Sequence, residues 1–180
     1  MKTVVLGLGS NNTLGSMTSV EILAQAVGEL SDVVMDIEKS SVYESDPMYV
    51  TDQNNFYNMV VRGGVSDDCS PYELLDFIHR IEAKYGRDRS KEIRFGPRTL
   101  DIDIEEFGSV VINDPDLILP HPRIHERQFV LLPLLEILKL SADRLVVEKY
   151  EKMLKLLPDQ GVRLCGKEIQ NEFNTFFAGI

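Results

Sequence analysis

The sequence predicts an α+β fold, an α/β sandwich built on an antiparallel sheet. Apolar, β-branched segments alternate with amphipathic segments in the order βαββαβ. Two amphipathic segments begin with a capping box, and one strand segment alternates strictly between apolar and acidic residues. This order is the ferredoxin-like, split βαβ arrangement, which places both helices on one side of the sheet. We expect extra C-terminal helices after this core.

The first half of the chain supplies a strand, a helix and two further strands. Residues 3–8 are an apolar, β-branched run, and Thr18 with Glu21 forms the capping box of a helix. Residues 33–43 and 56–65 are the next two strands, and a polar loop of about a dozen residues separates them, long enough to suggest a function. A dinucleotide-binding glycine loop just after the first strand is a weak interpretation, because the third glycine of that motif is missing.

The second helix is marked at both ends. Ser70 and Glu73 form its capping box, and Gly86 is placed to stop it. His79 and Glu82 are three residues apart and are expected to point together off the apolar face.

The C-terminal part is predicted to be mostly helical. We expect a helix over residues 129–138, interrupted or bent by Pro133, and then three more elements: a helix at 146–157, a short strand at 161–166 and a helix at 167–177. The predicted domains are a catalytic domain, residues 1–140, and a C-terminal extension, residues 141–180, packed on the same domain. The extension shows no chemical motif.

The strand at residues 99–107 carries the strongest chemical signal. Its side chains alternate between an apolar face and an acidic face: Leu100, Ile102 and Ile104 on the first, Asp101, Asp103 and Glu105 on the second. Asp101 and Asp103 project side by side, and such paired carboxylates suit magnesium carrying substrate phosphates. An edge strand with a solvated acidic face is the alternative for an isolated Asp-x-Asp.

Cations precede this strand and follow it. Residues 80–98 hold seven cations against three acids, a local charge of +4 in a chain of −10. A second group follows the strand, namely His121, Arg123, His125 and Arg127. Guanidinium groups bind phosphate oxygens well, so the two groups with the aspartates predict a magnesium-nucleotide site. A solvated loop with charges of both signs, and a structural role for His121, stay open.

Composition narrows the class of protein. A chain of 180 residues is about one domain, and 43% hydrophobic residues suffice for a core. The net charge of −10 argues against a general nucleic-acid or membrane-surface binder. We expect neither a signal peptide nor a membrane span. Cys69 and Cys165 match no metal spacing, so reduced thiols and a cytoplasmic location are predicted.

Five ordered motifs carry a family resemblance. They are Gly9-Ser10-Asn11, then Ser41-x-Tyr43 leading to Asp52-Gln53 and Phe56-x-Asn58, Gly86-Arg87-x-Arg89, Gly96-Pro97-Arg98-Thr99-Leu100-Asp101-Ile102-Asp103, and Pro120-His121-Pro122-Arg123 with Arg127-x-Phe129. Together they resemble the 6-hydroxymethyl-7,8-dihydropterin pyrophosphokinases of folate biosynthesis, from residue 6 to about residue 138. The resemblance implies transfer of pyrophosphate from ATP to the pterin hydroxymethyl group, releasing AMP.

The resemblance also implies roles for individual residues. Asp101 and Asp103 would bind two Mg²⁺ ions, and together with Arg89 and Arg98 they would be the catalytic residues. The residues implied for ATP, the co-substrate, are His79, Glu82, Arg89, Arg94, Arg98, His121 and Arg127. The residues implied for the pterin are Ser45, Asp46, Met48, Phe56, Asn58, Phe95 and Phe129, with Phe56 and Phe129 sandwiching the ring. A core Phe56 beside a turn Asn58 is the alternative on pattern alone.

Several points stay open at this stage. Phe95 stands where relatives often have Trp, and Tyr49 stands where glycine is common in relatives. The pterin hydroxyl could lose its proton to Asp103 or to water. A different magnesium-dependent nucleotidyl- or phosphotransferase, and a regulatory module that binds a nucleotide without turnover, are the rival functions. We expect small-molecule substrates, no nucleic acid or membrane partner, and a monomer or weak homodimer.

Overall fold

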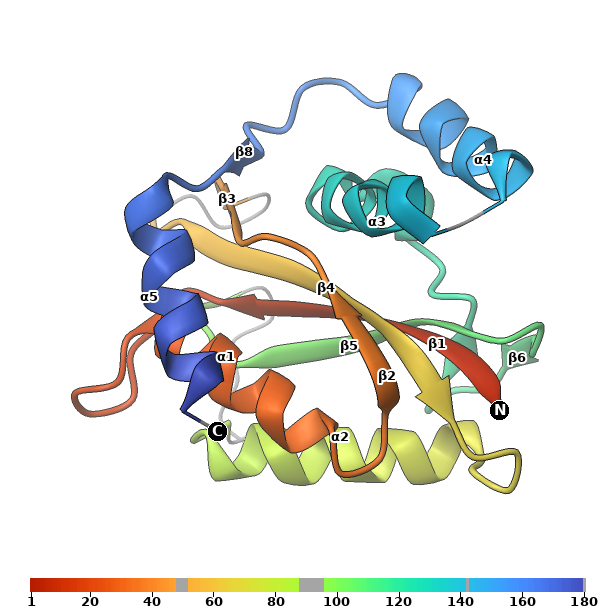
Figure 1. The fold of residues 1–180 in the computed structure, drawn as a ribbon, viewed down its shortest axis with the longest axis horizontal. Coiled ribbons are helices and arrows are strands. Elements are labelled where there is room, and N and C mark those ends of the chain that lie inside the picture. Colours follow the sequence, from red (N-terminus) through yellow and green to blue (C-terminus); the bar gives the residue numbers. More distant parts are fainter. Residues whose placement is uncertain (48–51, 88–95, 142, 180) are drawn as a thin grey trace.

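The computed structural model describes residues 1–47, 52–87, 96–141 and 143–179 (Figure 1). Its elements in chain order are β1 (Lys2–Ser10), α1 (Ser19–Leu30), β2 (Met35–Lys39), β3 (Tyr43–Ser45), β4 (Phe56–Val65), α2 (Pro71–Lys84), β5 (Asp101–Phe107), β6 (Ile112–Asn113), β7 (Ile118–Leu119), the 3-10 turn η1 (Ile124–Glu126), α3 (Gln128–Ser141), α4 (Arg144–Lys155), β8 (Arg163–Leu164) and α5 (Lys167–Ala178). The predicted α+β class and the helices of the C-terminal part are therefore confirmed.

The main sheet is antiparallel throughout. Its strand order is β5-β1-β4-β3-β8, and β2 pairs with β4 beside β3. The register places Gly9 of β1 between Asn58 of β4 and Asp101 of β5. An amide and a carboxylate from distant parts of the sequence thus lie in one row across three strands.

Helices cover both faces of the sheet (Figure 1). The larger core lies under α1 and α2 and includes Leu6, Leu23 and Ile78, all with no exposed surface. A second core lies between the other face and α3, where Val60 and Leu131 are fully buried. The two predicted core helices share one side, as expected, and α3 with α4 forms a third layer on the other.

Both predicted capping boxes are present. The Thr18 hydroxyl accepts from the Glu21 amide at 3.1 Å, and the Ser70 hydroxyl accepts from the Glu73 amide at 3.2 Å. In each case the glutamate accepts from the backbone of the capping residue. Helix α2 ends at Lys84, and Gly86 follows with a φ of 83°, a conformation that glycine adopts without strain.

The single strand expected at residues 33–43 is wrong, because the chain divides there into β2 and β3. The Ser40 hydroxyl accepts from the Val60 amide at 3.0 Å, in place of a backbone carbonyl. At Val42 the amide donates to the Gln170 side chain at 3.0 Å, and the carbonyl accepts from the same side chain at 2.7 Å. Side chains thus take part in the hydrogen bonding of this segment beside the backbone, where the Ser40 amide donates to the Val60 carbonyl at 3.0 Å, and the strand is interrupted between β2 and β3. Helix α3 runs through Pro133, so the expected interruption there is wrong, while the expected bend stays a prediction.

The C-terminal part wraps around the sheet. Helix α4 packs on α3 and buries Tyr150, while α5 packs on α1 and buries Phe173, each 2% exposed. Between them β8 pairs with β3. Figure 1 shows this segment crossing from one face of the sheet to the other along the β3 edge.

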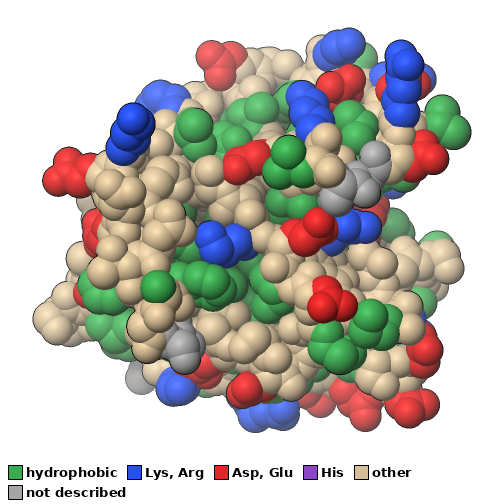
Figure 2. All heavy atoms as spheres, viewed as in Figure 1, with side chains coloured by type: hydrophobic (Ala, Val, Ile, Leu, Met, Phe, Trp, Pro, Cys, Tyr) green, Lys and Arg blue, Asp and Glu red, His purple; other side chains and the backbone are tan. Residues whose placement is uncertain are grey.

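Acidic and basic side chains are interspersed over the face seen in Figure 2. Within the described ranges no helix is long and apolar enough to cross a membrane.

Candidate functional site

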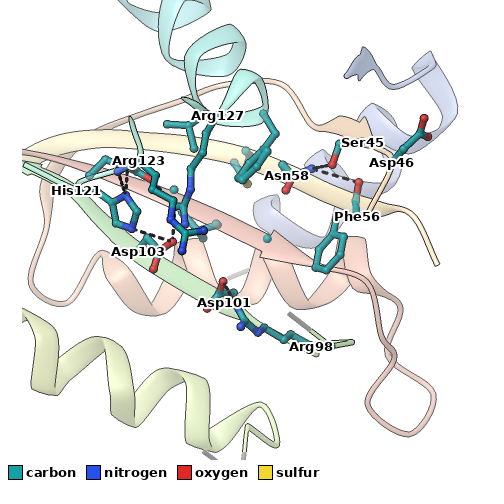
Figure 3. Close-up of a pocket in the computed structure, with 18 of the residues that line it drawn as sticks. Ser45, Asp46, Phe56, Asn58, Arg98, Asp101, Asp103, His121, Arg123 and Arg127 are labelled. Carbon is teal, nitrogen blue, oxygen red and sulfur yellow. Dashed lines mark hydrogen bonds and ion pairs between the residues drawn. The ribbon is translucent and has the colours of Figure 1, made fainter. Parts of the chain in front are cut away.

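A cavity of about 400 Å³ lies between the sheet and the N-terminal end of α3. Many of the predicted site residues line it: Ser45, Asp46, Phe56, Asn58, Arg98, Asp101, Asp103, His121, Arg127 and Phe129. Figure 3 shows Asp103, His121 and Arg127 at one side of this cavity and Ser45, Asp46, Phe56 and Asn58 at the other. Segments that are far apart in sequence therefore converge on one site.

The two aspartates of β5 are each paired with arginine. Asp101 accepts from Arg87 and from Arg98, both at 2.6 Å, and Asp103 accepts from Arg127 at 2.7 Å. Burial, followed by the charge of Asp103, raises the pKa of Asp101. Burial also opposes ionisation of Asp103, but the positive charge of Arg127 outweighs it and lowers the pKa of Asp103. One carboxylate is thus held firmly ionised beside another that is easier to protonate.

A third carboxyl, Glu105, is completely buried behind Asp103. Arg127 donates to both Asp103 and Glu105, the latter at 3.2 Å, and among the described residues the second Glu105 oxygen has no hydrogen-bond partner. Burial, then the Asp103 charge, raises the pKa of Glu105 to about 8. Gly7 on the neighbouring strand β1 leaves room for the Glu105 side chain, because a Cβ at Gly7 would lie 3.1 Å from it. The sequence analysis placed Glu105 on the acidic face of the strand but assigned it no role in the site.

His121 lies beside these carboxylates. Its Nδ1 accepts from the Arg123 amide at 3.1 Å, so the ring proton belongs on Nε2, which is 4.0 Å from an Asp103 oxygen. Burial, followed by the charge of Arg127, lowers the pKa of His121 to about 4. At neutral pH the imidazole is therefore uncharged and presents an N–H donor on the Asp103 side.

Asn11 ties together the loops around the charged side. Its side-chain oxygen accepts from the Arg98 amide at 2.7 Å, and its side-chain nitrogen donates to Gln53 and to the Asn54 carbonyl, each at 3.1 Å. Asn11 is only 3% exposed. Asn11, just after the first strand, thus holds these loops in place. Gly9 lets the Asn58 side chain approach the backbone of β1 closely, since a Cβ at Gly9 would be 3.3 Å from the Asn58 side-chain oxygen.

The other side of the cavity is aromatic and amide-bearing. Asn58 donates to the Ser45 hydroxyl at 2.9 Å, and both side chains are buried. Phe56 and Phe129 line the cavity from β4 and α3, and the Arg127 guanidinium lies 5.6 Å from the centre of the Phe129 ring. This side offers flat apolar surface beside a fixed amide, which suits a flat heterocycle.

Two predicted ATP residues lie outside the cavity lining, His79 and Glu82. Glu82, which was expected to point off the apolar face of its helix beside His79, is covered by neighbouring elements. Glu82 is 1% exposed, accepts from the Ile102 amide at 2.9 Å and pairs with Arg87. An unpaired buried carboxylate is costly, and Arg87 supplies the compensating charge. Glu82 therefore supports Arg87, which in turn holds Asp101.

Four predicted site residues lie outside the described residues: Met48, Arg89, Arg94 and Phe95. The cavity lining also includes Arg87, Glu105 and Arg123, to which the sequence analysis gave no individual site role, although Arg123 belongs to its second cationic group. Arg87 did belong to a quoted motif, Gly86-Arg87-x-Arg89. The burial of Glu105 has no local sequence signal, because its alternation is the same as that of Asp103.

The donor set at β5 fits a hard cation. Asp101 and Asp103 provide carboxylate oxygens on one face of a strand, the ligand type that Mg²⁺ prefers. Among the described residues, no group of three or more His, Cys, Asp or Glu is arranged to hold a metal. Two carboxylates suit Mg²⁺ that takes its remaining ligands from substrate phosphates and water.

Comparison with known proteins places the chain in a family. The family model for 7,8-dihydro-6-hydroxymethylpterin-pyrophosphokinase (HPPK) matches residues 5–139. A 2-amino-4-hydroxy-6-hydroxymethyldihydropteridine pyrophosphokinase of Bacillus subtilis is 43% identical over 134 residues, which is 73% of this chain and 75% of that protein. Its counterpart from Haemophilus influenzae is 36% identical over 167 residues, covering 88% of this chain and 100% of that protein.

Some relatives are longer proteins. The chain spans 27% of the folate synthesis bifunctional protein of Arabidopsis thaliana, at 39% identity and over 75% of this chain. A Plasmodium falciparum HPPK-DHPS crystal structure has a TM-score of 0.57 and 18% identity, over 86% of this chain and 44% of that one. A second HPPK-DHPS structure, in complex with substrates, has a TM-score of 0.60 and 13% identity, over 90% of this chain and 48% of that one. These structures show a shared fold, while the sequence matches show that this chain belongs to the HPPK family.

Proposed function

We propose that this protein transfers pyrophosphate from ATP to 6-hydroxymethyl-7,8-dihydropterin, giving AMP and the pterin pyrophosphate in folate biosynthesis. The observation that carries the proposal is the division of a single cavity into two chemically different sides. Paired aspartates with arginines line one side, and two phenylalanines with a buried amide line the other. A pyrophosphokinase needs both, because it must hold a charged phosphate chain against a flat heterocycle.

The charged side would bind the triphosphate. Arg98 and Arg127 provide guanidinium groups for phosphate oxygens, and His121 provides a neutral N–H donor. Two Mg²⁺ ions held by Asp101 and Asp103 would neutralise the charge that develops on the phosphate oxygens. The protein's own part is alignment of the pterin hydroxyl with the β-phosphorus, since in-line transfer requires little covalent chemistry from side chains.

The other side would bind the pterin. Phe56 and Phe129 offer ring faces for stacking, and Asn58 offers its amide to the polar edge of the ring. The hydrogen bond from Asn58 to Ser45 orients that amide before the substrate arrives. Asp46 at the rim completes this side. Contacts of Met48 and Phe95 with the pterin, and of His79, Arg89 and Arg94 with ATP, stay predictions.

Several wider assignments belong to the same proposal. The strand order β5-β1-β4, with β2 and β3 both paired to β4, supports a ferredoxin-like core. We assign residues 1–140 to the catalytic domain and residues 141–180 to an extension on the same domain. A monomer or weak homodimer in the cytoplasm, acting on small-molecule substrates alone, is our prediction for the cell.

The first experiment incubates the purified protein with ATP, Mg²⁺ and 6-hydroxymethyl-7,8-dihydropterin, and quantifies nucleotides and pterins by chromatography. We expect AMP and the pterin pyrophosphate in equal amounts, and neither with the Asp103→Asn variant. Formation of ADP in place of AMP would identify a different phosphotransferase. Nucleotide binding that survives in wild type and Asp103→Asn alike, with no product from either, would instead identify a module that binds without turnover.

A further inference from the structure

We propose that residues 159–165 act as a strap that fixes the distance between two walls of the cavity and thereby sets the affinity for the flat-ring substrate. The strap lies beyond the region that the family model matches, residues 5–139. The inference rests on the proposed function for the identity of the ligand, and on the contacts of the strap for everything else.

The first anchor of the strap is at the start of α3. The Gln128 amide donates to the Gln160 side chain at 2.9 Å, and the Gln160 amide donates to the Gln128 side chain, also at 2.9 Å. The Gln160 side chain donates in addition to the Glu126 carbonyl at 2.8 Å. These bonds hold the turn that places Arg127 and Phe129, both of which line the cavity.

The second anchor is at the end of β3. Arg163 donates to Asp46 at 3.3 Å, and β8 pairs with β3 through Glu44 opposite Arg163. Gly161 passes so close that a Cβ there would lie 2.5 Å from an Asp46 oxygen, and its φ is 67°. Asp46 also lines the cavity, next to Ser45. The strap thus contacts the start of α3 at residue 160 and the end of β3 at residues 161–163.

The ends of the strap are held independently of the cavity. On one side α4 is fixed by Tyr150, which is 2% exposed and hydrogen-bonds Glu106. On the other side α5 buries Phe173, and the Lys39 ammonium lies over two of its rings, 5.0 Å from the centre of Phe173 and 5.2 Å from the centre of Phe177. The apolar anchoring of the extension is therefore separate from the polar contacts of the strap. A polar substitution in the strap is expected to alter the cavity and leave the extension docked.

Two substitutions loosen the two anchors separately. Gln160→Ala removes both side-chain bonds to the α3 turn, and Gly161→Ala places a methyl group against Asp46 in a backbone conformation that alanine adopts poorly. Gly166→Ala is the matched control for the second, because a Cβ at Gly166 meets nothing within 4 Å among the described residues. Glu168→Ala is the control for the first, since Glu168 is exposed and its side chain makes no contact recorded among the described residues.

Steady-state kinetics provide the first readout. We expect KM for the pterin to rise about five- to tenfold in Gln160→Ala and Gly161→Ala. The values of kcat and of KM for ATP should stay within about twofold, because Arg127 keeps its hydrogen bonds to Asp103 and Glu105. Both controls should match wild type. Two outcomes would overturn the proposal. Equal changes in kcat and in both KM values would show that residues 159–165 have only a structural role, and no change beyond that of the controls would show that they do not affect the cavity.

Amide hydrogen exchange provides a readout that does not need activity. We expect faster exchange at residues 43–47 and 128–131 in both strap variants, with exchange in α5 unchanged. If the wild-type protein makes no AMP, the proposed function fails, and the hydrogen-exchange rates alone then test whether the strap holds the cavity walls. Faster exchange at both walls would support it, and exchange equal to that of the controls would contradict it.

Discussion

The two sides of the cavity are held in place by different kinds of interaction. On the charged side Arg87, Arg98 and Arg127 pair with the aspartates of β5 at 2.6–2.7 Å. On the ring-binding side the fixed contacts are a single buried hydrogen bond from Asn58 to Ser45 and the register of the strands. The groups proposed to bind metal and phosphate already bind each other, whereas Phe56 and Phe129 line the cavity as apolar side chains.

This difference indicates how each side responds to substrate. Phosphate groups and Mg²⁺ can exchange with the existing ion pairs, with arginine turning to phosphate and carboxylate to metal. The ring-binding side needs no such exchange, because its shape is set by the backbone. Damage to the charged side should therefore appear mainly in kcat, and damage to the ring-binding side mainly in KM.

The largest effect is expected for Asp103→Asn. Loss of this carboxylate charge should lower kcat by about 10²–10³-fold or more, because its electrostatic contribution belongs to the transition state. Stability should change by only about 1–2 kcal/mol, since the amide still accepts a hydrogen bond from Arg127. Asp76→Asn, on the exposed face of α2, is the matched control. A kcat within tenfold of wild type would remove Asp103 from the proposed metal site.

A smaller effect is expected for Phe129→Ala on the ring-binding side. Removing the ring should cost about 1–2 kcal/mol of stacking, which raises KM for the pterin about tenfold. KM for ATP should stay unchanged, and Phe129→Leu should give an intermediate value. A rise in KM for ATP instead would show that the two sides are not separate.

The pH dependence of stability tests the buried carboxyl of the charged side. The pKa of Glu105 is raised to about 8 from an ordinary value of 4.5, so the folded protein keeps this proton where the unfolded chain has lost it. The unfolded state then binds fewer protons, and the Glu105 contribution to stability falls as pH rises from about 4.5 to about 8. In Glu105→Gln that decline should disappear, as measured by chemical denaturation across this range. Parallel curves for the two proteins would mean that Glu105 is ionised.

The smallest effect is expected for Ser70→Ala, far from both sides. Loss of the capping hydroxyl should destabilise the protein by roughly 1 kcal/mol. Both KM values and kcat should match wild type at a temperature where the variant is folded. A change in kcat would show that α2 transmits strain to β5 through Glu82 and Arg87.

Local patterns predicted most elements of the fold. Capping boxes at Thr18 and Ser70, the stop at Gly86 and the alternation along β5 depend on residues a few positions apart. The division into β2 and β3 could not be predicted in the same way, because it depends on Gln170, far along the chain. The orientation of Glu82 depends likewise on Arg87 and on β5.

By itself the sequence determined the element types, the motif set and the candidate aspartates, since periodicity, caps and spacing act over short distances along the chain. Only the tertiary structure decided that Glu105 is buried, that Glu82 is buried against the Ile102 amide, and that the extension is hydrogen-bonded to the start of α3 at Gln160. Burial and long-range hydrogen bonds depend on which elements pack together. Which elements pack together depends on the whole core and cannot be predicted from any single segment.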